Sequence, residues 1–317
     1  MQSEIAKEFR NSNLRDILDY HFGWDRSASK KESGKRLRPL LLFLSLEACG
    51  GLWKEGLPAA CAIEFLHNYS LIHDDIEDQD EFRHGRKTLW QKYGLAEAIN
   101  AGDALYGLAF AQMKYLSDKA SPTANLSIFS MFSKAATQIT IGQAADLDFE
   151  ERKNITLGEY WQMARGKTAA LFQASTGMGS ILGKVDSKAN NSFSNFGLNL
   201  GLAFQARDDL LGIWGDPKET GKPTWSDLIK KKKSLPICFG LLNDGRFRKL
   251  YALEDTTSIH IQDENLVLAE IGAYDFTVSE IKKYSTKART HLLKTGIRNQ
   301  SIDALLELMD SLNARMI

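Results

Sequence analysis

Apolar residues recur at the three- and four-residue spacing of an α-helix along most of this chain. Long helices are expected at about 59–78, 89–118, 122–148, 156–184 and 189–214, and shorter ones at 234–243, 263–272, 277–295 and 301–315. Strand-type alternation, internal repeats and interdomain linkers are not evident. The pattern predicts an all-α fold, with residues 1–317 forming one domain of ten or more helices.

Prolines and capping residues locate several of the predicted helix ends. Pro58 suits the first turn of a helix, where its missing N–H would have no partner. Thr156 with Glu159, and Thr277 with Glu280, fit the capping box that opens a helix. Each pair therefore predicts a helix that begins directly after the threonine.

Two polar segments interrupt the helical pattern. Residues 79–87 are polar, and residues 215–223 contain glycine and proline, so both predict loops. Residues 59–73, in contrast, are apolar nearly all round. A helix of that kind is expected to lie at the centre of the molecule.

Composition narrows the class of protein. A chain of 317 residues can bury a sizeable core, and 40 Lys and Arg balance 40 Asp and Glu. This balance argues against bulk electrostatic binding of nucleic acid or anionic membrane. Cys49, Cys61 and Cys238 lack metal-ligand spacing, so we expect small buried residues in a reducing compartment. Without an apolar signal core or a membrane-length apolar run, the sequence predicts a cytoplasmic protein with no membrane span.

Two acidic clusters carry the clearest chemical signal. The first contains Asp74, Asp75 and Asp78, and the second contains Asp208 and Asp209. Asp74 and Asp78 are four residues apart, so they share a helix face on which like charges repel. Mg2+ prefers carboxylate oxygens and completes its shell with water and phosphate. The clusters therefore indicate a cavity whose two carboxylate walls hold a metal-bound diphosphate.

Several basic residues could complement these carboxylates. Lys35 and Arg38 lie three residues apart and combine a point charge with a planar fork, which suits a diphosphate. A solvated basic turn before a helix explains the same two residues. His67 precedes Asp74 by two helical turns and could equally be a core histidine. Lys167 lies on an apolar helix, where its charge either binds an anion or reaches water, so it too has two interpretations.

Other polar residues have a structural and a functional interpretation. Gln143 and Asp146 lie three apart in an apolar helix, where a structural hydrogen-bonded pair is the simpler reading. Lys222 stands in a Gly-Lys-Pro loop near the second acidic cluster. The cationic run 230–233 resembles a solvated face, although the nearby carboxylates favour one lysine reaching phosphate.

The order of these motifs is more specific than any one of them. It runs Gly-Lys-Arg-Leu-Arg-Pro, His67, Asp-Asp-x-x-Asp, Arg83, Gly-Gln-x-x-Asp, Lys-Thr, Gln-x-x-Asp-Asp and Gly-Lys-Pro. From about residue 34 to residue 236 this order resembles the trans-isoprenyl diphosphate synthase (polyprenyl synthetase) family. The resemblance implies an isoprenoid synthase fold, a homodimer and Mg2+-dependent head-to-tail condensation of isopentenyl diphosphate with an allylic diphosphate.

The resemblance also implies roles for individual residues. The metal site, with three Mg2+ ions when substrate is bound, would comprise Asp74, Asp75, Asp78, Asp208 and Asp209. Among these, the direct ligands would be Asp74, Asp78 and Asp208. Isopentenyl diphosphate would be held by Lys35, Arg38 and His67. The allylic diphosphate would be held by Arg83, Lys167, Lys222 and Lys232. The oxygens facing the developing carbocation would belong to Thr168 and Gln205.

Two positions depart from the family pattern. The second acidic motif usually ends in a third aspartate, where this chain has Gly212; Asp216 lies near it in sequence. The family's Arg-Arg-Gly becomes Arg-His-Gly, with His84 in the position of the second arginine and Arg86 nearby. These departures affect the expected metal and co-substrate geometry.

Product length depends on the residue beneath the growing chain. Tyr69 lies about one and a half helical turns before Asp74, and its neighbour Ser70 is small. In the family, an aromatic residue at this place resembles the geranylgeranyl (C20) type. The alternative is that Tyr69 packs against a neighbouring helix, away from the tail.

Three other functions remain open at this point. A farnesyl or longer polyprenyl diphosphate synthase would share the same motifs. A class I terpene cyclase would suit Gly212 and His84, but it would need no second diphosphate site with Arg38 and His67. A regulatory synthase subunit should have lost its acidic ligands, and this chain retains them.

Overall fold

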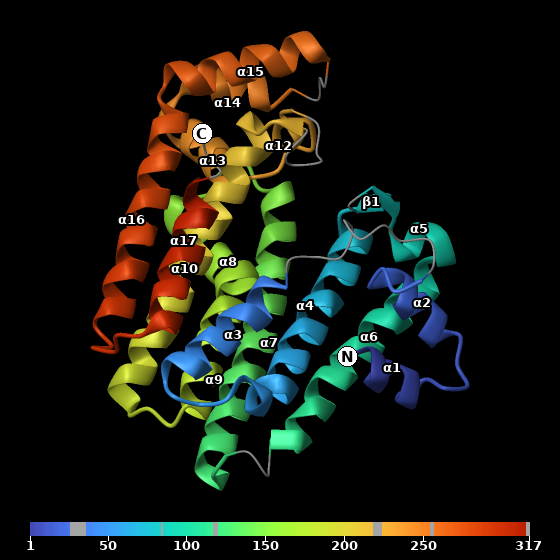
Figure 1. Cartoon of the computed structure of the whole chain (residues 1–317). Helices are drawn as coiled ribbons and strands as arrows, with labels where there is room; N and C mark the ends of the chain where they lie inside the picture. Colours follow the sequence, from blue (N-terminus) through green and yellow to red (C-terminus); the bar gives the residue numbers. More distant parts are fainter. Residues whose placement is uncertain (26–35, 84, 117–119, 218–223, 254–256, 315–317) are drawn as a thin grey trace.

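The computed structural model describes residues 1–25, 36–83, 85–116, 120–217, 224–253 and 257–314. Within these ranges nearly all regular structure is helical, so the predicted all-α class is confirmed. Figure 1 shows the long helices side by side along one direction. They are α3 (Leu37–Ala48), α4 (Leu57–Glu77), α6 (Leu95–Ala111), α7 (Pro122–Glu151), α9 (Ala170–Leu182), α10 (Ser187–Trp214) and α16 (Ala273–Leu293).

Shorter elements complete the bundle. Beside α6 lie α1 (Gln2–Glu8), α2 (Leu14–His21) and α5 (Leu89–Tyr93). Over one end of α10 lie α12 (Ser226–Ile229), α13 (Leu235–Asn243), α14 (Gly245–Tyr251) and α15 (Ser258–Glu270). The remaining helices are α8 (Leu157–Ala164) and α17 (Gln300–Ala314). Two 3-10 turns are η1 (Trp53–Gly56) and η2 (Gln112–Leu116), and η3 (Arg165–Ala169) is a π-helical turn.

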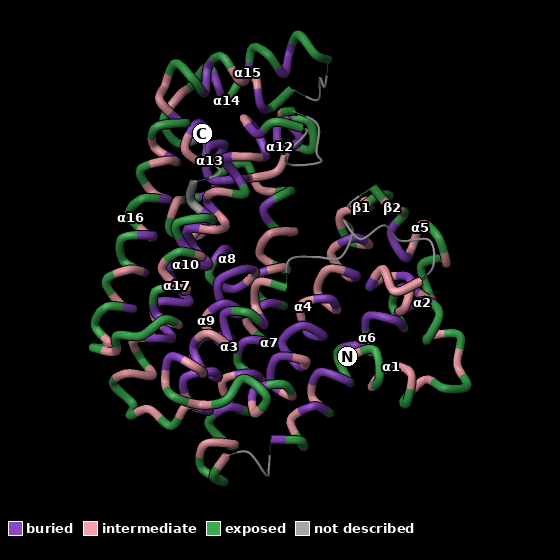
Figure 2. The backbone as a smooth tube through the Cα atoms, viewed as in Figure 1, coloured by how far each residue is buried: buried purple, intermediate pink, exposed green. Residues whose placement is uncertain are grey.

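The core is built around helices that are buried on most sides. Figure 2 shows buried residues on the inner helices and exposed residues on the outer faces. In α4, Phe65 and Leu66 are fully buried, which confirms the predicted central position of residues 59–73. Helix α10 contributes to three apolar clusters, through Leu198, Phe196 and Ile213. Helices α4 and α10 are therefore rigid supports for the acidic residues at their carboxyl-terminal ends.

The helix beginnings predicted from proline and capping residues are confirmed with one exception. Pro58 lies in the first turn of α4, and Thr156 forms a full capping box with Glu159 at the start of α8. The capping box predicted at Thr277 is wrong. Helix α16 already begins at Ala273, after Gly272 with a left-handed φ of 75°, and the buried Thr277 hydroxyl donates to the Ala273 carbonyl (2.8 Å). The hydroxyl that the motif assigned to a helix cap instead donates to a carbonyl within the same helix.

Three predicted segments are subdivided in the structure. The run 89–118 breaks at Gly94, whose φ of 90° separates α5 from α6. The run 156–184 is interrupted by η3. The predicted loop 79–87 contains a two-residue hairpin, in which β1 (Phe82–Arg83) pairs antiparallel with β2 (Arg86–Lys87). So short a ladder leaves no alternation pattern in the sequence.

Two predictions from composition can be compared with the structure. All three cysteines are free, but Cys238 is buried while Cys49 and Cys61 are partly exposed. The expected burial therefore holds for Cys238 alone. Across the described part of the chain, no helix is both long and apolar enough to span a bilayer.

Candidate active site

The first acidic cluster occupies the last turn of α4, at the end that leads into the hairpin (Figure 1). Asp74 and Asp75 lie within the helix, and Asp78 is its C-cap. The chain then leaves the helix through Gln79, which has a left-handed φ of 54°, and the Asp80 N–H donates to the Asp75 carbonyl (2.9 Å). Carboxylates here add to the negative pole of the helix dipole, so this end of α4 requires cations.

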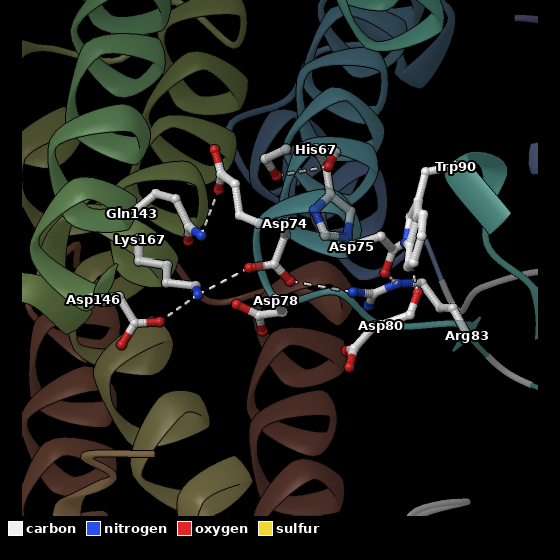
Figure 3. Close-up of polar contacts among 12 residues, drawn as sticks. His67, Asp74, Asp75, Asp78, Asp80, Arg83, Trp90, Gln143, Asp146 and Lys167 are labelled. Carbon is white, nitrogen blue, oxygen red and sulfur yellow. Dashed lines mark hydrogen bonds and ion pairs between the residues drawn. The ribbon is translucent and has the colours of Figure 1, made fainter. Parts of the chain in front are cut away.

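Arg83, on strand β1, supplies one of these cations. Its Nε donates to Asp75 Oδ1 (2.6 Å) and its Nη2 to Asp74 Oδ2 (3.2 Å), as Figure 3 shows. Burial raises the pKa of Asp75 to about 6, and the charge of Arg83 opposes that rise. Because Asp75 is buried against the guanidinium, it orients Arg83 toward Asp74.

Lys167, on η3, supplies a second cation. Its Nζ lies 3.0 Å from Asp74 Oδ1 and donates to Asp146 Oδ2 at 2.6 Å (Figure 3). Burial alone would raise the pKa of Asp74, but Lys167 and Arg83 outweigh it and hold that pKa below its usual value. Lys167 therefore reaches anions inside the protein instead of extending to bulk water.

Helix α7 lines the site with two polar residues that the sequence analysis interpreted as a structural pair. That interpretation is wrong, because Gln143 Nε2 donates to Glu77 on α4 (2.7 Å) and Asp146 accepts from Lys167. Each residue connects α7 to a different element. Asp146 was not among the predicted site residues, and the Gly-Gln-x-x-Asp motif is the signal that could have identified it.

The π-helical turn η3 depends on a close approach between two backbones. A Cβ atom added to Gly142 would lie 2.1 Å from the Lys167 backbone nitrogen. One added to Gly166 would lie 2.7 Å from the Gln138 carbonyl oxygen. Such distances leave no room for side chains, so α7 and η3 touch through glycines. The extra residue in the π turn directs Lys167 toward α4 and Thr168 toward α10.

The lysine run 230–233 also contacts the first acidic cluster. Lys232 Nζ donates to Asp78 and Lys230 Nζ donates to Asp80. Burial lowers the pKa of Lys232, but the Asp78 carboxylate outweighs this effect and raises it. The run is therefore not a solvated face, because two of its members join the loop after α12 to the end of α4.

The second acidic cluster presents one exposed and one buried carboxylate. Asp208 is exposed, whereas Asp209 is 6% exposed. Asp209 accepts hydrogen bonds from Tyr160 Oη (2.6 Å), Gln205 Nε2 (2.7 Å) and the Leu235 N–H (2.7 Å). Burial raises the pKa of Asp209 to about 7, and the three hydrogen bonds oppose the rise. Asp209 therefore anchors α10 to its neighbours, and Asp208 is accessible at the same end of the helix.

Arg38 and His67 form a separate basic pair. Arg38 Nη1 lies 3.0 Å from His67 Nε2, and the guanidinium stacks over Phe172 at 4.9 Å. Because arginine can only donate, Nε2 accepts and the imidazole proton resides on Nδ1. Burial, reinforced by the charge of Arg38, holds the pKa of His67 well below its usual value, so His67 is neutral at pH 7. Arg38 Nε is buried without a hydrogen-bond partner among the described residues, which leaves one donor that a bound anion would satisfy.

One cavity connects the two groups of charged residues. Its volume is about 230 Å³. Arg38 and His67 lie in its wall, as do Asp74, Lys167 and Thr168, and α7 contributes Ile139, Thr140, Gln143, Ala144 and Leu147. Tyr69 and Ser70 lie in the same wall, and the Tyr69 ring also contacts the tilted rings of His73 and Tyr106 with centroid distances of 4.7 and 5.0 Å. Tyr69 therefore both lines the cavity and packs against neighbouring rings, so it combines the two alternatives considered for it.

The structure brings most of the predicted site residues together. One group surrounds the end of α4 and contains Asp74, Asp75, Asp78, Arg83, Lys167 and Lys232. Thr168 donates to Gln205, which connects this group to α10 and the second acidic cluster. Lys35, His84 and Lys222 lie outside the described residues.

Arg86 is the arginine nearest in sequence to residue 84, where the family usually has its second arginine. Its Nη2 donates to Asp25 Oδ1 (2.9 Å) and its Nη1 to the Tyr20 carbonyl (3.0 Å). Its guanidinium carbon also lies 4.0 Å from the centroid of the Tyr20 ring. These contacts hold Arg86 against α2 and its following turn.

Comparison with known proteins adds sequence and structural evidence. A sequence model of the polyprenyl synthetase family matches residues 27–266. A (2E,6E)-farnesyl diphosphate synthase of Mycobacterium bovis is 36% identical over 307 residues, covering 93% of this chain and 84% of the relative. A geranylgeranyl diphosphate synthase of Saccharolobus solfataricus is 36% identical over 305 residues, covering 95% and 90%.

Solved structures give the same result. A polyprenyl synthetase from Streptomyces coelicolor A3(2) superposes with a TM-score of 0.89 at 33% identity, covering 98% of this chain and 94% of that one. A polyprenyl synthase from Caulobacter crescentus CB15, complexed with calcium and isoprenyl diphosphate, superposes with a TM-score of 0.81 at 26% identity, covering 100% and 97%. These matches extend over nearly the whole chain and include the site described above. The chain belongs to the polyprenyl synthetase family and is a prenyltransferase.

Proposed function

We propose that this protein condenses isopentenyl diphosphate with an allylic diphosphate, with Mg2+ as cofactor and geranylgeranyl diphosphate (C20) as product. The observation that carries the proposal is one cavity whose wall contains two separate cations, Arg38 and Lys167. Arg38 and His67 lie at one position in its wall, and Asp74 with Lys167 lies at another. A condensation of two diphosphates needs two anion sites that share one reaction space.

The carboxylates of the site suit a metal ion that binds together with the diphosphate substrate. Across the described ranges, no three histidine, cysteine or carboxylate side chains converge closely enough to hold a metal unaided. Mg2+ commonly uses one or two carboxylates and takes further ligands from phosphate and water. Asp74 Oδ1 is buried and ion-paired with Lys167 Nζ at 3.0 Å, and a metal ion would take the place of this cation. Asp74, Asp78 and Asp208 would hold the Mg2+ ions, which would neutralise the departing diphosphate as Lewis acids.

The cations around α4 suit the allylic diphosphate. Arg83, Lys167 and Lys232 are paired with Asp74 and Asp78. Each can exchange a carboxylate for a phosphate oxygen, because both are strong anionic acceptors. Prior pairing keeps the cations oriented, so less side-chain entropy is lost when substrate binds.

Thr168 and Gln205 are arranged to stabilise a positive charge. The Thr168 hydroxyl donates to Gln205 Oε1, and Gln205 Nε2 donates to Asp209 Oδ1. The proton of Thr168 is thereby directed toward Gln205, and Thr168 lies in the cavity wall with its oxygen lone pairs free to accept. When the allylic C–O bond breaks, these lone pairs would face the cation. The alkene of isopentenyl diphosphate then forms the new C–C bond, and the released diphosphate accepts the proton.

A homodimer is part of the same proposal. Apolar side chains are exposed on the outer faces of α6 and α7, including Ile99, Phe129, Leu126 (69%) and Ile141 (52%). An exposed row of this kind favours a protein partner. Light scattering coupled to gel filtration will measure the molar mass, and a mass close to 35.5 kDa would rule the dimer out.

A direct assay tests the proposed reaction. Purified protein is incubated with Mg2+, isopentenyl diphosphate and each allylic primer in turn, and the products are identified by chain length. The expected product is a linear C20 diphosphate whose formation requires both substrates. A cyclic hydrocarbon formed from an allylic diphosphate alone would contradict the condensation.

Arg38→Gln is expected to weaken isopentenyl diphosphate binding by about 10- to 150-fold. The reason is the loss of a charge-assisted contact, which costs about 1.5–3 kcal/mol. Lys232→Gln should instead weaken binding of the allylic diphosphate, because Lys232 contacts Asp78. Arg36→Gln removes the same charge from an exposed position near Arg38 and serves as the control. Equal effects of the Arg38 and Lys232 variants on both substrates would contradict the two-site arrangement.

Tyr69→Ala is expected to lengthen the product beyond C20, and Ser70→Phe to shorten it toward C15. Removing the Tyr69 ring enlarges the cavity, whereas an aromatic side chain at residue 70 fills it. Tyr106→Ala is the control, because it removes a ring in contact with Tyr69 that is not part of the cavity lining. Chain lengths are measured by mass spectrometry. An unchanged product with a lower Tm in Tyr69→Ala would assign Tyr69 to packing, where loss of a large aromatic costs about 3–5 kcal/mol.

A further inference from the structure

Glu264, on α15, is a fully buried carboxylate that lies outside the active-site cavity. Its Oε1 accepts a hydrogen bond from Lys231 Nζ (2.7 Å) and lies 3.3 Å from His260 Nε2. His260 Nε2 also lies 3.1 Å from the Leu250 carbonyl oxygen, so it faces two acceptors and carries the ring proton. A buried carboxylate is costly unless it is paired, so Glu264 holds Lys231 in one position.

Lys231 has a left-handed backbone conformation, with a φ of 51°. A residue other than glycine adopts this conformation at a cost, so tertiary contacts must hold it. The ammonium group provides two of them, because it binds Glu264 and lies 4.7 Å from the centroid of the Tyr251 ring. The Lys231 N–H also donates to the Leu228 carbonyl (3.1 Å). The ion pair therefore fixes a strained turn as well as a side chain.

The residue after this turn belongs to the proposed diphosphate site. Lys232 Nζ donates to Asp78 at the end of α4, whereas the Lys231 side chain contacts α15. The Tyr251 hydroxyl donates to the Lys232 carbonyl (3.1 Å), which fixes the backbone at this position. Figure 1 shows α12 and α15 at the same end of the bundle. One lysine is thus anchored in α15, and the next one reaches the first acidic cluster.

We propose that Glu264 is a positioning residue for the allylic diphosphate, because its ion pair with Lys231 sets the turn that presents Lys232 to the active site. This inference rests on the proposed role of Lys232 in binding that diphosphate. Glu264 would act through the backbone and would not touch the substrate. A lysine side chain has many rotamers, so fixing the backbone that carries it lowers the entropy lost on binding.

The proposed effect should be confined to one of the two substrates. Arg38, assigned to isopentenyl diphosphate, contacts His67 on α4 and the Phe172 ring on α9. Neither of these contacts involves α12, α14 or α15. Loss of the Glu264 ion pair should therefore weaken allylic binding and leave isopentenyl diphosphate binding unchanged. A carboxylate with only a structural role would lower the Tm without this difference between the substrates.

Calorimetric titration of the full chain with farnesyl diphosphate and Mg2+, and separately with isopentenyl diphosphate, tests the proposal. Glu264→Gln preserves the shape of the side chain and is expected to weaken farnesyl diphosphate binding by about fivefold or more. Isopentenyl diphosphate should bind within about twofold of the wild type. Glu270→Gln is the matched control, because Glu270 lies on the same helix and is 59% exposed beside Arg246. It should bind both substrates like the wild type.

A double-mutant cycle tests whether Glu264 acts through Lys231. Lys231→Asn breaks the same ion pair, and asparagine tolerates the left-handed conformation. It should weaken farnesyl diphosphate binding as Glu264→Gln does, and the double variant should be no weaker than either single one. Losses that add in the double variant would overturn the proposal. Lys231→Asn gives the same test of the two affinities if Glu264→Gln does not fold.

Lys232→Gln separates this inference from the proposed function. If the wild type binds farnesyl diphosphate no better than Lys232→Gln, the proposed role of Lys232 fails and this inference fails with it. If Lys232→Gln is weak and Glu264→Gln binds like the wild type, only this inference is overturned, whatever the Tm of Glu264→Gln. Equal losses for both substrates in Glu264→Gln would overturn it as well, because they would indicate a general loss of structure.

Discussion

Replacing Asp74 with asparagine is expected to lower kcat/KM by about 1,000-fold or more while the protein still folds. Asp74 is the carboxylate shared by Arg83 and Lys167, and it would also bind the metal. The variant would therefore lose a metal ligand and the group that orients two diphosphate-binding cations. Steady-state kinetics at saturating Mg2+ measures the effect.

Thermal stability distinguishes this effect from misfolding. The pKa of Asp74 is lowered in the folded protein, so its ionised form contributes stability above the unfolded pKa of about 3.9. That contribution disappears as the pH falls through the folded pKa. At pH 7 and without Mg2+, Asp74→Asn should therefore melt slightly below the wild type, and the difference should vanish in acid.

Asp148→Asn is the control for Asp74→Asn. Asp148 lies on α7, and its side chain is 60% exposed and paired with Arg152. Its replacement should change neither rate nor Tm appreciably, because exposed pairs contribute about 0–1 kcal/mol. A rate for Asp74→Asn within tenfold of this control would exclude Asp74 as a metal ligand.

Gly142→Ala is expected to lower kcat by about 100-fold and to destabilise the fold by about 1–3 kcal/mol. The added Cβ would lie 2.1 Å from the Lys167 backbone nitrogen, and backbone atoms cannot rotate away as a side chain can. The π-helical turn must therefore move away from α7. Lys167 would then lose its alignment with Asp74 and Asp146, although no charged residue has been changed.

Gly107→Ala is the matched control for Gly142→Ala. Gly107 lies in α6, and a Cβ added there meets nothing within 4 Å. This substitution should leave kcat unchanged and stabilise the helix by about 0.5–1 kcal/mol, as expected for glycine to alanine at an exposed helical position. If Gly142→Ala resembles Gly107→Ala in both kcat and Tm, the close contact between α7 and η3 does not position Lys167.

Local sequence patterns were sufficient to predict the helical class and the approximate extent of several long helices, such as α4, α7 and α10. Helix α4 illustrates the reason, because its apolar residues, Pro58 and the acidic residues at its end all favour one structure. The ordered motifs also predicted that Asp74, Arg83 and Lys167 belong to one site. Helical periodicity and the order of motifs can be read from the linear sequence, because both depend on residues close together in the chain.

Residue pairing across elements was decided by tertiary structure. The sequence offered no reason for Asp146 to bond Lys167 or for Lys232 to bond Asp78, since these partners are far apart in the chain. Thr277 shows that a local motif can also mislead. Its capping motif predicted a helix start, but α16 begins one turn earlier, at Ala273. The partner that a polar group finds depends on which other polar groups the packing of the helices brings near it and leaves unpaired.

Periodicity in the sequence by itself predicted the all-α fold, and residue types predicted two acidic clusters facing a bound diphosphate. The prenyltransferase activity followed from the resemblance of the ordered motifs to the polyprenyl synthetase family. Only the tertiary structure decided how the charges neutralise one another and which carboxylate holds Lys231. Glu264 lies 33 residues beyond Lys231, on α15, and only packing of α15 against α12 brings the two together. Contacts of this kind depend on the relative placement of whole helices, which local propensity does not encode.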